Sequence, residues 1–152
     1  MAQPPTEFGD LAVEPSPRPV GRTARSPDTV SLLVVDDQKS IRTLVRECLK
    51  TLGYRNVVEC EDGERALLYL QRHTVHMVIS DLDMPQMTGL ELLAAIRKSP
   101  RLRELGFLML TSRGDADMVR KAVDLGVNNY LTKPFAMGDL KRKIESILGQ
   151  LA

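Results

Sequence analysis

The fold is restricted most strongly by a regular alternation of short apolar runs and longer amphipathic segments after residue 30. The runs at the start of SLLVVDD (31–37) and in GFLMLT (106–111) are continuously apolar, as expected for strands buried on both faces of a sheet. Apolar residues then recur with helical spacing from Ile41 until Gly53 ends the segment. This alternation predicts βαβ units with right-handed crossovers.

The pattern repeats along the chain and predicts an α/β fold. Strands are expected at 31–37, 56–60, 75–81, 106–111 and 127–132. Helices are expected at about 41–52, 64–73, 88–98, 115–125 and 140–151. Because each strand is followed by a helix, we expect a five-stranded parallel sheet with helices on both faces.

Residues 1–29 differ in composition from the rest of the chain. Six of the nine prolines lie there, among Ser, Thr, Arg and Gly, without sustained periodicity. Such a segment buries too little apolar surface to offset the entropy lost on ordering it. We predict a disordered Pro-rich tail (1–29) and a single folded domain (30–152), and a partner-binding or tethering role for the tail stays open.

Charge and composition limit the classes of partner. A formal net charge of +1 gives no broad basic surface, so we expect no nucleic-acid partner. No apolar run approaches the length of a membrane span, and the opening residues do not resemble a signal peptide, so we expect a cytoplasmic protein. Cys48 and Cys60 have neither metal-ligand spacing nor a disulfide framework, and we expect reduced core thiols.

Polar side chains stand at the ends of four predicted strands, and they are Asp36, Asp37, Asp81, Thr111 and Lys133. Parallel strands end at one edge of the sheet, where open α/β sheets bind their ligands. Taken alone, Asp81 could equally be a helix-capping residue. Taken together, the set favours a functional site.

The chemistry of such a set is restricted. Three neighbouring carboxylates raise one another's pKa unless a cation is present, and Mg²⁺ prefers carboxylate and phosphate oxygens. Lys133 would add a positive charge suited to a phosphoryl group, and Thr111 would add a hydroxyl donor. The set therefore predicts phosphoryl transfer to a carboxylate.

Four motifs carry a family resemblance: LLVVDDQKSIR, VISDLDMPQMTGLELL, LMLTSRGD and NNYLTKPF, in this order. Over about residues 30–151 the chain resembles the receiver domain of two-component response regulators, most closely the CheY-like chemotaxis type. The resemblance implies a flavodoxin-like (β/α)5 fold with strand order 2-1-3-4-5. It also implies a monomeric, stand-alone response regulator that a histidine kinase or a small phosphodonor phosphorylates, and that is not an enzyme beyond its own phosphorylation and dephosphorylation.

The resemblance implies a role for each site residue. Asp81 would accept the phosphoryl group, and Thr111 and Lys133 would contact its oxygens. Direct ligands of Mg²⁺ would be Asp37, Asp81 and the backbone carbonyl of Asp83, while Asp36 would act mostly through water.

Further positions follow from the same resemblance. Tyr130 would move inward when Thr111 is drawn to the phosphate, although a half-buried strand aromatic without a switching role is the alternative. Lys133–Pro134 would be a cis peptide, Phe135 would pack the turn before the last helix, and Gly89 would relieve crowding. The fourth helix, fifth strand and fifth helix would bind a downstream partner, although their charges could equally be a solvated surface.

Three other classes fit part of the pattern. DLDMP matches the DxD motif of haloacid-dehalogenase-like phosphatases, but in those enzymes the acidic pair comes last, whereas here it comes first. A flavodoxin-like FMN binder would share the architecture, but Asp36 and Asp37 would repel a phosphate without a metal. A receiver-like module that binds its partner without phosphorylation is the nearest alternative.

Asp83 and Arg113 carry opposite charges two residues after Asp81 and Thr111, respectively. In the receiver domains that the chain resembles, these positions flank the route of the hydrolytic water. We therefore expect the two side chains to pair across the mouth of the site, hinder that water and lengthen the phosphorylated state, in a contact worth at most about 1 kcal/mol. Arg113→Ala should therefore speed self-hydrolysis of the phosphorylated protein, measured as loss of label over time. An unchanged rate would contradict the hypothesis.

Overall fold

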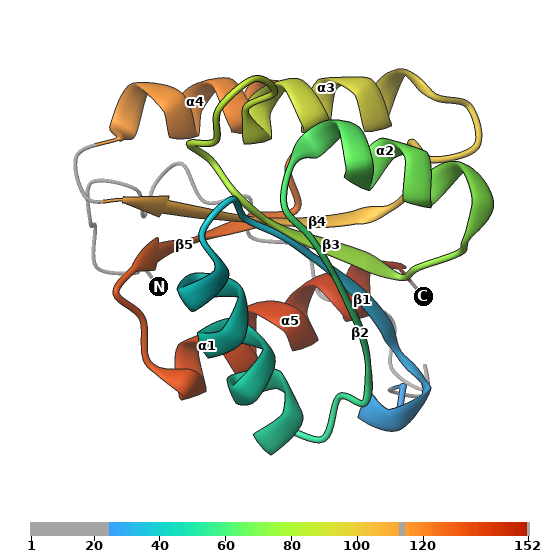
Figure 1. Cartoon of the computed structure of the whole chain (residues 1–152), viewed down its shortest axis with the longest axis vertical. Coiled ribbons are helices and arrows are strands. Elements are labelled where there is room, and N and C mark those ends of the chain that lie inside the picture. The colour runs from blue at the N-terminus through green and yellow to red at the C-terminus, as the bar shows by residue number, and fades with distance from the viewer. Residues whose placement is uncertain (1–24, 113–114, 152) are drawn as a thin grey trace.

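The computed structural model of the chain describes residues 25–112 and 115–151. Five strands form one parallel sheet in the order β2-β1-β3-β4-β5, which confirms the predicted fold class and strand order (Figure 1). The strands are β1 (Ser31–Val35), β2 (Asn56–Cys60), β3 (Met77–Asp81), β4 (Gly106–Ser112) and β5 (Asn129–Lys133). The helices are α1 (Lys39–Thr51), α2 (Gly63–Arg72), α3 (Gly89–Lys98), α4 (Ala116–Asp124) and α5 (Met137–Leu151).

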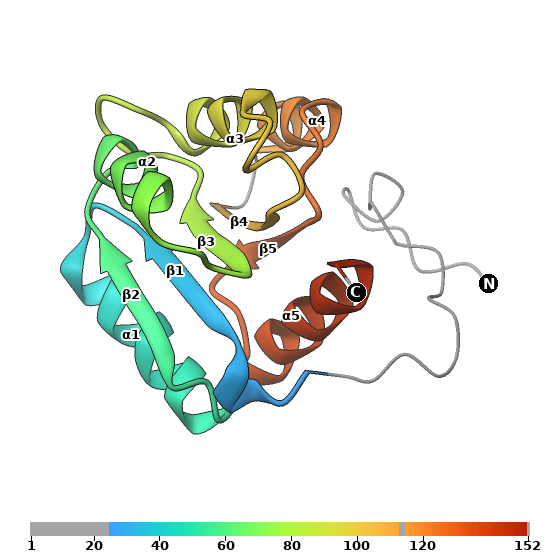
Figure 2. The ribbon, with the colours of Figure 1, turned by 90° about the vertical axis from the view of Figure 1, so that its right-hand side faces the viewer.

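Helices cover both faces of the sheet, so the central strands are buried on two sides. Figures 1 and 2 show α1 and α5 on one face and α2, α3 and α4 on the other. In β1, Leu32 and Val34 pack into the core under α1 and α5, whereas Leu33 and Val35 pack into the core under α2, α3 and α4. The continuous apolar run therefore supplies two cores, as a strand buried on both faces must.

Local signals set the starts of two helices that follow the sheet edge. Asp62 caps α2, since its side chain accepts a hydrogen bond from the backbone N–H of Arg65. Thr88 and Glu91 form a capping box at α3, in which each side chain accepts a hydrogen bond from the other's backbone N–H. These contacts satisfy amide groups that the first helical turn leaves unpaired.

The structure differs from the sequence prediction at the ends of several elements. β1 ends at Val35, so Asp36 and Asp37 stand beyond the strand, and β3 begins at Met77. Pro27–Thr29 form a short 3-10 helix, and the Asn56 side chain donates a hydrogen bond to the carbonyl of Asp28. These three residues, which fall in the segment predicted to be a disordered tail, therefore lie beside β2. Residues 1–24 of that predicted tail lie outside the described residues.

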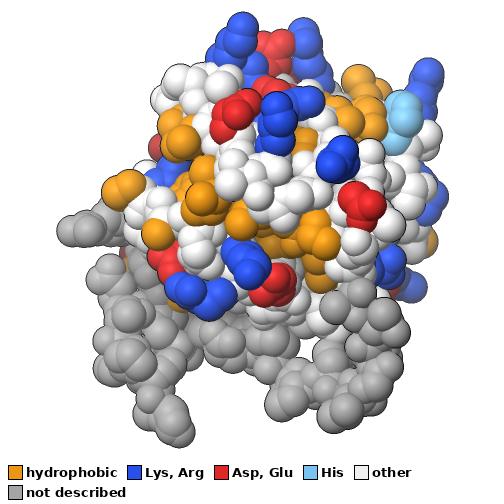
Figure 3. All heavy atoms as spheres, turned by 90° about the horizontal axis from the view of Figure 1, so that it is seen from below, with side chains coloured by type: hydrophobic (Ala, Val, Ile, Leu, Met, Phe, Trp, Pro, Cys, Tyr) orange, Lys and Arg blue, Asp and Glu red, His pale blue; other side chains and the backbone are white. Residues whose placement is uncertain are grey.

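One apolar residue of α1 does not face the core. Leu44 is 53 % exposed, although its spacing predicts a place on the apolar stripe of the helix. The apolar stripe of α1 is wider than the surface by which α1 contacts the sheet. Val45 and Leu49 of α1 pack into the core between this helix and the sheet. On this side of the molecule, apolar side chains are visible between charged ones (Figure 3).

Within residues 25–112 and 115–151, no helix combines the length and apolar character that crossing a bilayer requires. Cys48 and Cys60 are both free and partly buried beside the cores, in agreement with their expected role.

Gly89 lies where the first turn of α3 packs against the end of β3. A Cβ atom there would stand 2.4 Å from the backbone oxygen of Asp81 and 2.9 Å from the sulfur of Met109. The predicted relief of crowding is therefore confirmed, because the nearest atom belongs to rigid backbone.

Gly89→Ala should lower the free energy of unfolding by about 1–3 kcal/mol, because α3 must shift away from β3 to admit the methyl group. Gly138→Ala is the matched control, since a Cβ in α5 would meet only the Arg142 guanidinium at 3.6 Å and helix propensity favours Ala. Urea unfolding of the two variants measures both effects. Equal stability of the two variants would contradict this account.

Candidate functional site

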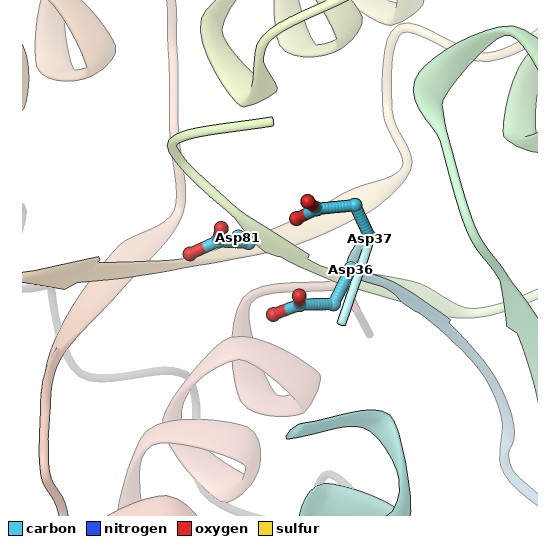
Figure 4. A group of neighbouring side chains, drawn as sticks. All are labelled: Asp36, Asp37 and Asp81. Carbon is cyan, nitrogen blue, oxygen red and sulfur yellow. The ribbon is translucent and has the colours of Figure 1, made fainter. Parts of the chain in front are cut away.

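Three aspartates converge at the carboxyl edge of the sheet. Asp36 and Asp37 follow β1, and Asp81 is the last residue of the neighbouring strand β3. Each offers a carboxylate oxygen, and these oxygens lie within 4.8 Å of one another. Figure 4 shows the three carboxylates pointing to the same side. The predicted acid cluster is thus assembled by strand pairing.

The three acids differ in burial. Asp36 and Asp81 are 2 % and 6 % exposed, whereas Asp37 is exposed. Asp36 Oδ1 accepts a hydrogen bond from the Gln38 backbone N–H at 2.9 Å, but its Oδ2 is buried without a hydrogen-bond partner among the described residues. A buried oxygen of this kind, beside two further carboxylates, fits a hard divalent cation such as Mg²⁺.

Burial is the main influence on the pKa of the two buried acids. It raises the pKa of Asp36 from 3.8 to about 6, and the negative charge of Asp81 adds to the effect. Burial also raises the pKa of Asp81, while the hydrogen bond and positive charge of Lys133 oppose this rise. Mutual repulsion, which the sequence predicts, contributes less to both pKa shifts than removal from water does.

Lys133 contacts the predicted phosphoacceptor directly. Its Nζ donates to Asp81 Oδ1 at 2.8 Å, from the end of β5 on the far side of β4. The Lys133–Pro134 peptide is cis, as the resemblance implies, and Phe135 packs against the core under α1 and α5. The strand order therefore brings together a lysine and an aspartate that are 52 residues apart in the sequence.

Thr111 stands at the same edge, between these two residues. The register of β3 and β4 pairs Asp81 with Leu110, so that Thr111 lies one position beyond the phosphoacceptor candidate. Its side chain is fully buried, and its hydroxyl has no hydrogen-bond partner within the described part of the chain. An unsatisfied buried hydroxyl is costly, and a phosphoryl oxygen at Asp81 is the kind of acceptor it would suit.

Tyr130 is buried rather than half-buried, with 6 % of its surface exposed, and the Lys143 ammonium lies 5.4 Å from its ring centroid. Its inward movement on phosphorylation stays a prediction.

Asp83 is exposed in the loop between β3 and α3. The role expected of its backbone carbonyl as a Mg²⁺ ligand stays a prediction. Arg113 lies outside the described residues, and its pairing with Asp83 is untested.

Sequence reasoning missed one contact with the acid cluster. The Arg42 guanidinium on α1 donates from Nη1 to the backbone carbonyl of Asp36 at 2.6 Å. The available signal was an arginine six residues after the first acid, at the start of a helix. Spacing alone does not reveal a bond to a backbone oxygen, because every residue carries one.

Known proteins resemble the chain over most of its length. The CheY protein of Pseudomonas aeruginosa, a chemotaxis protein, is 39% identical over 118 residues, which cover 78% of this chain and 95% of that protein. The chemotaxis protein CheY1 of Helicobacter pylori is 39% identical over 121 residues, which cover 79% of this chain and 98% of that protein.

Solved structures agree with the fold. The chemotaxis response regulator CheY4 of Vibrio cholerae superposes with a TM-score of 0.72 at 32% identity, covering 78% of this chain and 98% of that one. A response regulator receiver protein from Pseudomonas putida gives a TM-score of 0.70 at 31% identity, covering 76% and 94%. The model of the response regulator receiver domain matches residues 32–145. With the strand order and the acid cluster at its edge, these matches show that the chain belongs to the response regulator receiver domain family.

Proposed function

We propose that this response regulator accepts a phosphoryl group on Asp81 in a Mg²⁺-dependent reaction and signals to a partner protein in trans. The observation that supports this most directly is the contact of Lys133 with Asp81 at 2.8 Å, inside a cluster of three carboxylates. A histidine kinase or a small phosphodonor would supply the phosphoryl group. The protein would act as a monomer and turn over no other substrate.

In the proposed reaction, a carboxylate oxygen of Asp81 forms a bond to phosphorus while the bond from phosphorus to the donor nitrogen or oxygen breaks. The Lys133 charge opposes the rise in the Asp81 pKa that burial causes, and its ammonium would contact the transferred group. Thr111, whose hydroxyl lacks a hydrogen-bond partner within residues 25–112 and 115–151, would donate this hydroxyl to a phosphoryl oxygen.

The residues that would hold Mg²⁺ are Asp37, Asp81 and the carbonyl of Asp83, with Asp36 acting mostly through water. When bound, Mg²⁺ would neutralise the charge that develops on the phosphoryl oxygens. The buried Asp36 Oδ2, which no described residue hydrogen-bonds, supports a cation beside it.

Phosphorylation would shift an existing equilibrium between two surface arrangements, in which Thr111 and Tyr130 take part. The surface formed by α4, β5 and α5 would bind the downstream partner. The similarity to CheY proteins named for chemotaxis suggests that pathway for this chain.

A phosphotransfer assay tests the proposal. Incubation with a small phosphodonor and Mg²⁺ should label wild-type protein with a single acid-stable, base-labile phosphoryl group, and Asp81→Asn should remove the label because its amide is not a nucleophile. Asp62→Asn is the matched control, because Asn also caps α2 and the residue lies outside the cluster. Labelling of Asp81→Asn at the wild-type level would contradict the proposal.

The same proteins separate the alternatives. Partner binding that is unchanged in Asp81→Asn would favour a phosphorylation-independent module. Sustained hydrolysis of a phosphomonoester would favour a phosphatase, and a flavin absorption spectrum would favour an FMN binder.

The raised pKa of Asp36 predicts how stability and metal binding depend on pH. The folded protein holds this proton more tightly than the unfolded chain, whose pKa is 3.8, so the proton stabilises the fold fully below that pH. That contribution, of the order of 1–3 kcal/mol, is lost as the pH rises through about 6. Mg²⁺ competes with the same proton, so its stabilising effect should be full above a pH of about 6 and should weaken below it.

Thermal unfolding measures this dependence. It is followed one pH unit above and one pH unit below the folded pKa of Asp36, with and without millimolar Mg²⁺. At ten times its dissociation constant, Mg²⁺ should stabilise the protein by about 1.4 kcal/mol at the higher pH. NaCl at matched ionic strength is the control, and Asp36→Asn should reduce the pH dependence, leaving the part that comes from the raised pKa of Asp81. Equal stabilisation by Mg²⁺ at both pH values would show the prediction to be wrong.

A further inference from the structure

Arg42 links α1 to the backbone beneath the acid cluster. Its Nη1 donates to the Asp36 carbonyl at 2.6 Å, and its Nε donates to Glu59 Oε1 on β2 at 3.2 Å. The side chain is only 15% exposed, so the guanidinium is largely shielded from water. A planar fork with donors on two sides suits this position, whereas a lysine has one nitrogen for both acceptors.

The backbone of Asp36 is held from two elements. Its N–H donates to the Cys60 carbonyl at the end of β2 at 3.2 Å, and its C=O accepts from Arg42. The carbonyl belongs to the peptide unit that joins Asp36 to Asp37. Fixing that unit restricts the directions in which both carboxylates leave the end of β1.

Arg46 provides an internal comparison one helical turn later. Its Nη1 donates to Glu59 Oε2 at 3.0 Å and to the Val57 carbonyl at 3.3 Å. These contacts also join α1 to β2, but they lead to the strand rather than to the acids. Arg42 and Arg46 thus share a helix, a charge and a carboxylate partner. They differ in the bond to the Asp36 carbonyl and in burial, since the Arg46 side chain is 46% exposed.

We infer that Arg42 is a positioning residue that orients the Asp36–Asp37 pair for Mg²⁺ through the Asp36 carbonyl. The inference rests on the proposed function, because it concerns the metal that phosphorylation would require. Partners that orient metal ligands typically change affinity by about 10-fold or more when they are removed.

The sign of the effect distinguishes positioning from charge. Removing a positive charge near an acid cluster makes the local potential more negative, which strengthens cation binding. Loss of positioning weakens binding, because the free carboxylates must then be ordered by the metal itself. The inference therefore predicts that removing Arg42 weakens Mg²⁺ binding, whereas the loss of its positive charge alone would strengthen it.

The experiment measures Mg²⁺ affinity by amide chemical-shift titration of the unphosphorylated full-length chain. Arg42→Gln should raise the dissociation constant about 10-fold. Arg46→Gln, the matched control, removes the same charge and a Glu59 contact, and should leave the constant unchanged or slightly lower. Thermal unfolding of both variants without Mg²⁺ reports the general stability lost with each arginine.

Affinity that is equal to or tighter than wild type in Arg42→Gln would overturn the inference, as would equal weakening in the two variants. If Arg42→Gln does not fold, Arg42→Lys takes its place: weaker binding than wild type supports positioning by the fork, and wild-type affinity overturns it. Failure of the wild-type protein to bind Mg²⁺ would contradict the proposed function itself, and the inference with it.

Discussion

Burial of carboxylates at the end of a parallel sheet is the constraint on which the site depends. Asp36 and Asp81 lose most of the water that would solvate their charges, and such burial is costly unless the charge is paired or hydrogen-bonded. Lys133 offsets part of the cost at Asp81, and the Gln38 N–H offsets part of it at Asp36. The buried Asp36 Oδ2, which has no hydrogen-bond partner among the described residues, explains why a cation suits this edge.

The two buried acids have different surroundings, which fit different tasks. Asp81 contacts a lysine ammonium, so a positive charge opposes the effect of burial on its pKa and favours the ionised form that a nucleophile needs. Asp36 accepts a hydrogen bond from a backbone amide instead, and its pKa rises to about 6. One sheet edge thus holds a candidate phosphoacceptor in contact with a lysine and a second buried acid whose pKa is raised to about 6.

Sequence patterns predicted the elements well where periodicity and packing agree. The apolar runs became buried strands, and the set at their ends came together because parallel strands finish at one edge. Prediction failed where packing overrides the pattern. Leu44 has helical spacing but lies outside the contact between α1 and the sheet, and Pro27–Thr29 are ordered through contact with a distant strand. The strand order itself came from family resemblance, since periodicity does not specify which strands are neighbours.

The sequence by itself determined the alternation of strands and helices, the parallel sheet and the identity of the polar residues at the strand ends, because hydrophobic spacing and position along the chain are local properties. Only the tertiary structure decided which of those residues touch. It placed Lys133 on Asp81, buried Asp36 while leaving Asp37 exposed, and brought Arg42 to a backbone carbonyl. These outcomes depend on strand register and on the packing of α1 against β2, and both arise from contacts between residues that are distant in the sequence.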